Sequence, residues 1–412
     1  MSSDDMRIVI TGIGVVSPIG IGKEAFWQGL KEGRSGIKPV TLFDTSTTRS
    51  KLAGEITDFK PEEILGPKGL RNPDRTTKLA LCAAKLCLDD ANFQITEENT
   101  NDVGVVLGST MGSVWSISEY DKQALKEGPR SVNPALFANT VINSPASQIS
   151  IRFGIRGFNT TISTGFSSAL DALKYASDFI KWGKAKAVLV GSAEELCEQF
   201  FKGFYKLGVL SKPQDGNQEM LCPFDKRRNG TILGEGAAVF LLESLSHARQ
   251  RSANIYAEIK AIASSFDKRS MNRYNLKATG EIESMEKTLS LAKLDAKDID
   301  CVVASANSTV KGDQAESTAI TQVFDGNKPS VTACKSMFGE TFSVAGAMNL
   351  AAGIFILKDQ FIPPTLNLKQ KDIQCDVECV NNAGISKTVN HVLINSFGAS
   401  GQNSSLVLMR DN

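Results

Sequence analysis

Histidine is almost absent from this sequence of 412 residues, which contains only His247 and His391. No uninterrupted apolar run approaches the roughly 20 residues that a helix needs to cross a bilayer. Neither sign of charge predominates, because 46 basic residues stand against 45 acidic ones, and no long Lys and Arg run is interleaved with aromatics. These absences argue against a membrane protein and against a nucleic-acid-binding protein.

The eight cysteines are scattered and lack both the close paired spacing of a zinc site and the density of a disulfide scaffold. We therefore expect buried thiols in a reducing cytoplasm, and no metal site. The polar, acidic start at 1–5 lacks the basic region and apolar core of an export signal. A cytoplasmic location is the expectation.

Gly12-x-Gly14 follows an apolar run, as a dinucleotide-binding fingerprint would. Ser17 stands where the third glycine of that fingerprint is required. We therefore expect no phosphate-binding loop here and no cofactor.

Short apolar runs alternate with stretches in which apolar residues recur at spacings of three and four. The runs are typical of buried strands and lie at 8–11, 103–107, 187–190, 239–242, 259–262, 302–304, 392–394 and 406–409. The helical patterns lie at 78–91, 167–182, 282–294 and 344–357. This alternation predicts an α/β fold.

Similar sub-segments recur in the same order in the two halves of the chain. The pairs are 105–109 with 302–306, 161–173 with 330–350, 188–192 with 393–397, and 239–242 with 406–409. Any two α/β segments look alike at this level, so spacing alone leaves the duplication open. A duplication would divide the chain near residue 255, into units 1–254 and 255–412.

The most distinctive local pattern is Ile162-Ser163-Thr164-Gly165-Phe166-Ser167-Ser168-Ala169, in which a strand runs through small residues directly into a helix. Such an elbow exposes one side chain at a helix N-terminus, where the helix dipole favours a thiolate or an oxyanion. Many tight strand-to-helix turns are only structural, so the pattern alone leaves both interpretations open.

Seven motifs in the chain resemble those of β-ketoacyl synthases, and they occur in that family's order. They are IVITGIGVVSPIG at 8–20, QISIRFGIRG at 148–157, PFDK at 223–226, LGEG at 233–236, KSM at 335–337, IPPTLN at 362–367 and NSFG at 395–398. The chain is identified as a member of this family on these motifs. The resemblance implies a thiolase-like fold, with two duplicated βαβαβαββ halves forming a layered α-β-α-β-α core.

Three catalytic positions of that family carry other residues here. The nucleophilic cysteine of the elbow is replaced by Phe166, whose side chain has no nucleophilic atom. The two histidine positions are occupied by Ser305 and by Glu340, a carboxylate that would oppose an enolate. We therefore expect no catalytic residue at these positions, and a chain that is no enzyme on its own.

Other residues match positions that surround the family's active site. Lys335, Asp313 and Glu316 do so, and without the nucleophile we expect them to be structural. Lys335 and Glu340 are expected to form a buried ion pair. Cys334 is expected to be buried and inert, although it neighbours a cation.

The combination of a complete scaffold with substituted catalytic positions resembles the chain-length factors of type II polyketide ketosynthases. The resemblance implies a heterodimer in which a catalytic ketosynthase subunit supplies the cysteine and histidines. This chain would shape the tunnel whose depth sets polyketide length, and an acyl carrier protein would bind transiently. Chain-length factors commonly carry glutamine at the elbow, so Phe166 departs from their pattern.

The resemblance also implies where the two subunits meet. The strand leading into the elbow should pair across the dimer axis through Asn159, Thr160, Thr161, Ile162 and Ser163. The preceding segment 133–149 should reach the partner and provide the tunnel gate. The gate candidates are Phe137, Val141 and Ile142, with Thr110, Met111 and Trp115 as a second choice, and ordinary interface packing is the alternative for each.

Two other functions stay open at this point. A hydrolase or acyltransferase of carrier-bound thioesters would use Ser163, Ser167 or Cys334 as its nucleophile, although no base is evident in the sequence. A non-enzymatic scaffold of a biosynthetic complex is the other. The sequence does not identify the product, its chain length or the partner chain.

Overall fold

The computed structural model describes residues 3–214, 216–268 and 274–411. In that part of the chain the main sheet has eleven strands, and ten of them follow the order β11-β10-β14-β15-β9-β1-β8-β7-β5-β6. The strands of the first half are β1 (Ile8–Ser17), β5 (Val103–Gly108), β6 (Asn159–Ile162), β7 (Ala187–Glu194) and β8 (Gly236–Ser244). Those of the second half are β9 (Ala257–Phe266), β10 (Cys301–Val303), β11 (Ser330–Thr332), β14 (His391–Phe397) and β15 (Gln402–Met409).

The two halves repeat one topology, which confirms the duplication. The first half runs β6-β5-β7-β8-β1 and the second runs β11-β10-β14-β15-β9, strand for strand. In each half the first three of these strands are parallel, and the remaining neighbours pair antiparallel. The half-sheets join where β1 pairs with β9 through Ile8↔Ile259, Val9↔Glu258 and Ile10↔Ala257. The boundary between residues 254 and 255 falls just before β9 and stays a prediction.

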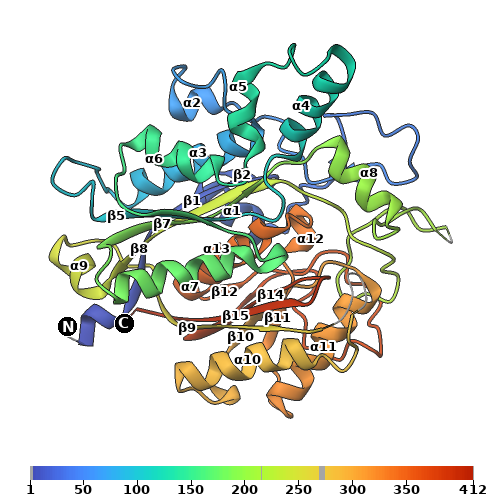
Figure 1. Ribbon diagram of the computed structural model, residues 1–412. Helices are drawn as coiled ribbons and strands as arrows, with labels where there is room; N and C mark the ends of the chain where they lie inside the picture. The colour runs from blue at the N-terminus through green and yellow to red at the C-terminus, as the bar shows by residue number, and fades with distance from the viewer. Residues whose placement is uncertain (1–2, 215, 269–273, 412) are drawn as a thin grey trace.

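Figure 1 shows five layers, as the resemblance implied. The helices α3 (Arg75–Asp90) and α6 (Ser144–Phe153) cover the outer face of the first half-sheet, and α10 (Thr279–Ala292) and α11 (Val310–Phe324) cover that of the second. Between the half-sheets lie α7 (Ser168–Lys181) and α13 (Ser343–Asp359). The thiolase-like α-β-α-β-α core is therefore confirmed.

The position of each central element follows from its apolar pattern. All six residues of β5 are buried, as expected for a strand with helices on both faces. On α13 every residue from Ser343 to Leu357 is buried, so this helix has no solvent-facing side, and its sequence is apolar on every side. The α7 helix keeps one polar face.

Gly14 is required by close packing between a strand and a helix, and not by a phosphate. A Cβ atom at Gly14 would lie 1.9 Å from the carbonyl oxygen of Ala83 on α3. At Gly12 it would lie 2.7 Å from the Cβ of Ala91 and from the carbonyl oxygen of Cys87. The Gly-x-Gly spacing therefore lets α3 lie directly on β1.

Shorter elements cover the ends of the sheets. They are α1 (Lys23–Lys31), α2 (Pro61–Leu65), α4 (Val114–Glu127), α5 (Pro134–Phe137), α8 (Glu198–Lys206), α9 (Leu245–Gln250), α12 (Lys335–Phe338), β2 (Gly20–Ile21), β3 (Lys38–Pro39), β4 (Leu52–Ala53), β12 (Phe361–Ile362) and β13 (Ile385–Ser386). Among the helices of the described ranges, none is long and apolar enough to cross a membrane.

Candidate functional site

The elbow has the predicted strand-to-helix geometry. β6 ends at Ile162, Gly165 adopts a φ of +71°, and α7 begins at Ser168. A positive φ favours glycine, which allows this sharp turn. Phe166 lies half-buried at the helix N-terminus, and its carbonyl oxygen accepts a hydrogen bond from Ser396 Oγ at 3.1 Å.

A cluster of aromatic rings fills the space in front of the elbow. The ring of Phe342 lies 5.8 Å from that of Phe166, 5.1 Å from that of Phe200 and 5.1 Å from that of Phe204, measured between centroids. Phe342 immediately precedes α13 and has φ +55° and ψ −123°, which is a strained conformation for a residue with a side chain. Its N–H donates to Glu340 Oε1 at 2.9 Å, which helps to hold it there.

The two family histidine positions belong to one buried polar network. Lys335 Nζ lies 2.8 Å from Glu340 Oε2, and the two side chains are 2% and 1% exposed. This confirms the expected ion pair. Asn307 Nδ2 donates to Glu340 Oε2 at 2.9 Å, and Lys335 Nζ lies 3.4 Å from Ser305 Oγ. Every charge in the network therefore has a partner.

Two carboxyl groups of α11 hold the loop that carries this network. Glu316 Oε1 accepts from the N–H of Ser305 at 2.8 Å, and Asp313 Oδ1 accepts from the N–H groups of Asn307 and Ser308 at 3.0 and 3.1 Å. Burial raises the pKa of Glu316 to about 7 and that of Asp313 to about 6. Both contacts position backbone, as expected for structural residues.

The alternative nucleophiles are placed poorly for attack. Cys334 is fully buried, and burial raises the pKa of its thiol to about 12. Ser167 is also fully buried, with its hydroxyl 3.3 Å from Asp171 Oδ2. Ser163 is exposed and donates only to the carbonyl oxygen of Thr110 at 3.4 Å.

The two histidines lie away from these hydroxyls and are half-buried, not the surface residues that their context suggests. His247 Nδ1 lies 2.6 Å from Glu243 Oε1, and His391 Nδ1 lies 3.0 Å from the carbonyl oxygen of Asp298. Both are therefore held by contacts at other places in the fold. Within the described ranges no three His, Cys, Asp or Glu side chains form a group that could hold a metal ion.

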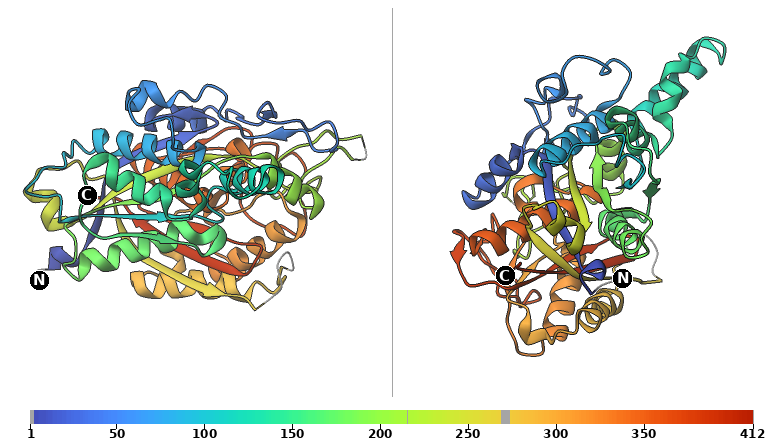
Figure 2. Two further views of the ribbon diagram at one scale, coloured as in Figure 1. Left: turned by 45° about the horizontal axis from the view of Figure 1, so that its top comes forward. Right: turned by 90° about the vertical axis from the view of Figure 1, so that its left-hand side faces the viewer.

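The segment 110–142, which contains the gate candidates, carries α4 and α5, and these helices project from the body of the molecule (Figure 2). Gly112, next to Met111, lies against Ile142, because a Cβ there would be 3.3 Å from the Cα of Ile142. On α4 only Ser116 is buried. The large apolar side chains of this segment are exposed, by 41% for Met111, 44% for Trp115, 58% for Phe137, 41% for Val141 and 38% for Ile142.

Thr110 differs from the other gate candidates because it is held from three sides. Its N–H donates to Glu194, its Oγ1 donates to the carbonyl oxygen of Gly165 at 3.2 Å, and it accepts from the N–H of Ser343 at 2.9 Å. Thr110 therefore fixes the elbow to the start of α13, and we expect its substitution to disturb both.

Four of the five predicted dimer-interface residues form the edge strand β6 (Asn159–Ile162), and Ser163 follows it. This strand pairs with β5 on one side, and no strand in the described part of the chain pairs with its other side. Asn159 is exposed and Thr161 Oγ1 is buried without a hydrogen-bond partner. β6 thus offers a free edge, and its pairing with another subunit stays a prediction.

Sequence reasoning missed Asn307 and Phe342 as residues of the site. Asn307 lies two positions after Ser305 in the same motif stretch, so a signal for it was present. Phe342 had no such signal, because its ring partners Phe200 and Phe204 lie far away along the chain.

Comparison with known proteins gives matches over nearly the whole chain. The family model described as "Beta-ketoacyl synthase, N-terminal domain" matches residues 5–248, and "Beta-ketoacyl synthase, C-terminal domain" matches residues 256–369. The 3-oxoacyl-[acyl-carrier-protein] synthase 2 of Coxiella burnetii (strain RSA 493 / Nine Mile phase I) is 35% identical over 408 residues, which cover 98% of both chains.

Solved structures of related proteins are also similar throughout. The ishigamide ketosynthase/chain length factor has a TM-score of 0.92 at 31% identity, covering 98% of this chain and 99% of that one. A type II polyketide synthase acyl-carrier protein in complex with its ketosynthase bound to the hexaketide has a TM-score of 0.89 at 28% identity, with the same coverage.

The relatives contradict the expectation that this chain alone is no enzyme. Several curated relatives that match it over nearly its full length carry the name 3-oxoacyl-[acyl-carrier-protein] synthase 2, which is a catalytic enzyme. That expectation was wrong because it rested on three side-chain positions. Losing one set of catalytic groups excludes one mechanism, whereas similarity over the whole chain points to an enzyme.

Proposed function

Because this chain belongs to the β-ketoacyl synthase family, we propose that it is a chain-length factor, the subunit of a type II polyketide synthase that sets product length. It pairs with a ketosynthase chain. It contributes one wall of the tunnel into which the growing polyketide extends.

The observation that carries this proposal is the exposed apolar surface beside a free strand edge. Met111, Trp115, Phe137, Val141 and Ile142 expose large apolar side chains on the projecting segment, and β6 lacks a partner strand on one side in the described residues. Contiguous apolar surface next to an unpaired edge is typical of a subunit interface. Such a surface supports a stable pair.

The mechanism of length control is steric. A tunnel of fixed depth accepts successive two-carbon units until its end is reached, and a further unit then has to overpack the wall. Overpacking costs about 1 to 3 kcal/mol, which shifts a product ratio by about 5-fold to 150-fold. The proposed gate side chains are Phe137, Val141 and Ile142, with Thr110, Met111 and Trp115 as a second choice.

The relatives support the expected partners. One similar structure is a ketosynthase/chain length factor, and another holds a type II acyl-carrier protein with its ketosynthase. We place the same two partners with this chain, the carrier protein binding transiently. We also propose a cytoplasmic location, which the scattered cysteines without disulfide pairing support.

Co-expression with the ketosynthase encoded beside this chain tests the proposal. We expect a one-to-one complex in size-exclusion chromatography with light scattering. We also expect malonyl carrier protein to be condensed by the complex, with product formation that depends on both chains. Separate elution of the two chains would contradict the pairing.

A further inference from the structure

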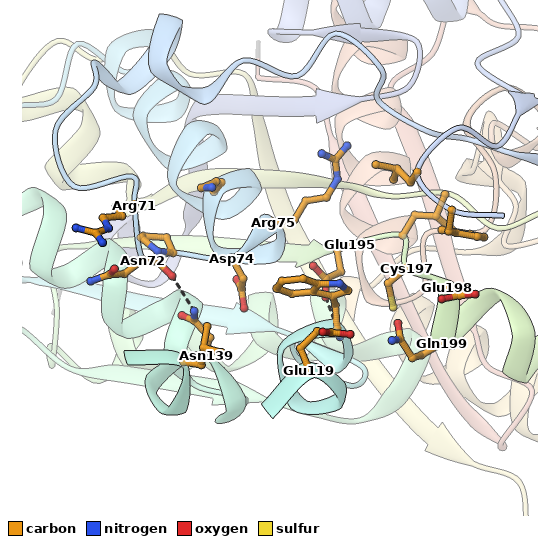
Figure 3. A pocket seen from close by; sticks show the side chains of 17 residues that line it. Arg71, Asn72, Asp74, Arg75, Glu119, Asn139, Glu195, Cys197, Glu198 and Gln199 are labelled. Atoms are coloured by element: carbon orange, nitrogen blue, oxygen red, sulfur yellow. Dashed lines mark hydrogen bonds between the residues drawn. The ribbon is translucent and has the colours of Figure 1, made fainter. Parts of the chain in front are cut away.

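A pocket of about 480 Å³ lies between α3, α4 and the segment that follows β7 (Figure 3). Its apolar wall is formed by Leu42, Phe43, Trp115 and Leu136. Its deeper wall carries two carboxyl groups, Asp74 at the start of α3 and Glu195 directly after β7. Of these residues, Trp115 is a gate candidate and Leu136 lies in the gate segment 133–149, whereas the others lie outside the gate and elbow positions described above.

Glu195 is the carboxyl group of this wall that retains free hydrogen-bonding capacity. Asp74 accepts from the N–H of Thr77 and from Ser116 Oγ, both at 2.9 Å, so each of its oxygens is occupied. The Glu195 side chain belongs to a residue that is 2% exposed, and its Oε1 accepts a hydrogen bond from the backbone N–H of Trp115 at 3.2 Å. Its Oε2 has no hydrogen-bond partner in the described part of the chain.

The surroundings of Glu195 favour its protonated form. Burial, and next the negative charge of Asp74, raise the pKa of Glu195 to about 8. At neutral pH the group is therefore mostly a carboxylic acid, which can donate a hydrogen bond into the pocket. The cation Arg75 does not compete for it, because its guanidinium is paired with Glu235 at 2.6 Å.

The pocket adjoins both the gate and the elbow. Trp115 lines the pocket and is also one of the exposed gate candidates. Its indole ring therefore separates the pocket from the proposed subunit interface. On the other side Phe43, Leu196 and Cys197 line the pocket and belong to the apolar cluster that contains Phe166 and Phe342. A chain that passes the gate would therefore arrive at Glu195.

We propose that this pocket receives the far end of the growing chain and that Glu195 hydrogen-bonds to a keto oxygen there, so that the pocket selects oxygenated chains over reduced ones. The identity of the occupant rests on the proposed function. A fully reduced chain would cover Glu195 and leave its free oxygen without a partner, which is unfavourable for a buried polar group. A keto group gives that oxygen a partner and keeps the rest of the chain against Trp115 and Leu136.

The experiment measures binding of two thioesters of equal length to the complete chain. The probes are the 9-oxodecanoyl and decanoyl thioesters of N-acetylcysteamine, followed by isothermal titration calorimetry. We expect the wild-type chain to bind the keto probe about fivefold more tightly, as one hydrogen bond allows. Glu195→Leu should abolish this preference, and Glu195→Gln, which still donates, should keep most of it.

Glu283→Gln is the control, because Glu283 lies on α10, outside the pocket, and is paired with Lys287 at 2.6 Å on the surface. It should leave the preference unchanged. Equal preference in the wild type, Glu195→Leu and Glu195→Gln would overturn the inference, and circular dichroism melting verifies that each variant is folded.

This outcome is separable from that of the pairing experiment. A stable, active complex whose chain shows no Glu195-dependent preference would refute the pocket and leave the length-setting role intact. A Glu195-dependent preference in a chain that pairs with no ketosynthase would keep the pocket as a binding site for oxygenated acyl chains, and would refute the length-setting role.

Discussion

At the scale of single residues, the ion pair of Lys335 and Glu340 forms a buried polar network with Asn307 and Ser305. Glu340→Gln leaves the ammonium of Lys335 buried without its counter-charge. We expect this substitution to lower the free energy of unfolding by about 3 kcal/mol, because breaking a buried pair costs more than the pair gains. Urea denaturation measures the change.

The matched control is Glu97→Gln, which removes an exposed pair between Glu97 and Arg156. No measurable change in stability is expected there, since exposed pairs contribute little. Equal midpoints for Glu340→Gln and the wild type would show that the network does not stabilise this site.

The aromatic cluster around Phe342 combines residues that the sequence predicted with contacts that it did not. Phe166 was found from the motif that contains it, and Glu340 from its distance after Lys335-Ser336-Met337. The strained backbone of Phe342 and its stacking on Phe200 depend on how α8 and α13 come together, which neither residue's neighbours in the sequence specify.

At the scale of elements, the segment that carries α4 and α5 exposes several large apolar side chains, and on α4 only Ser116 is buried. Its apolar side chains are expected to be covered by the partner, so a charge placed there should break the complex and spare the fold. We predict that Ile142→Asp abolishes co-purification with the ketosynthase while the melting temperature stays within about 2 °C of the wild type.

Leu207→Asp provides the comparison, because Leu207 is 56% exposed at the end of α8, outside the proposed interface. It should leave pairing intact. Loss of the complex with both variants, or with neither, would contradict the assignment of this surface.

The central elements were predictable because burial on two faces produces continuous apolar runs, as in β5 and β7. The helical pattern at 344–357 likewise marked α13. The projecting helix α4 was not predicted, since only one of its residues is buried and its pattern therefore carries little information about the core.

At the scale of the whole molecule, buried acids make stability depend on pH. Burial raises the pKa of Glu194, Glu219, Glu281 and Glu316 to about 7, from the ordinary value of 4.5 for a glutamate side chain. The folded state therefore holds protons that the unfolded state has already released between about pH 4.5 and 7. Stability is full below this window and falls as pH rises through it.

We therefore predict that the melting temperature falls between pH 5 and pH 8, measured by differential scanning fluorimetry. Glu316→Gln should make the slope shallower, because its amide does not titrate. A melting temperature that rises across this range would show that these carboxyl groups do not carry the pH dependence.

The fold of the whole molecule followed from ordered motifs, but the expectation of an inactive chain did not survive comparison with its relatives. Motifs such as those at 8–20 and 395–398 are spread over the whole chain and therefore identify its fold. Phe166, Ser305 and Glu340 bear only on one catalytic mechanism. Full-length similarity to catalytic enzymes therefore outweighs three substituted positions.

The most direct test of the length-setting role is the product distribution of the reconstituted pair, measured by mass spectrometry, with wild-type chain and with Ile142→Ala. Removing this side chain enlarges the proposed tunnel, so the account predicts the same rate of malonyl consumption and a shift of at least one two-carbon unit toward longer products. An unchanged length distribution from a fully active complex, repeated with Phe137→Ala and Trp115→Ala, would contradict it.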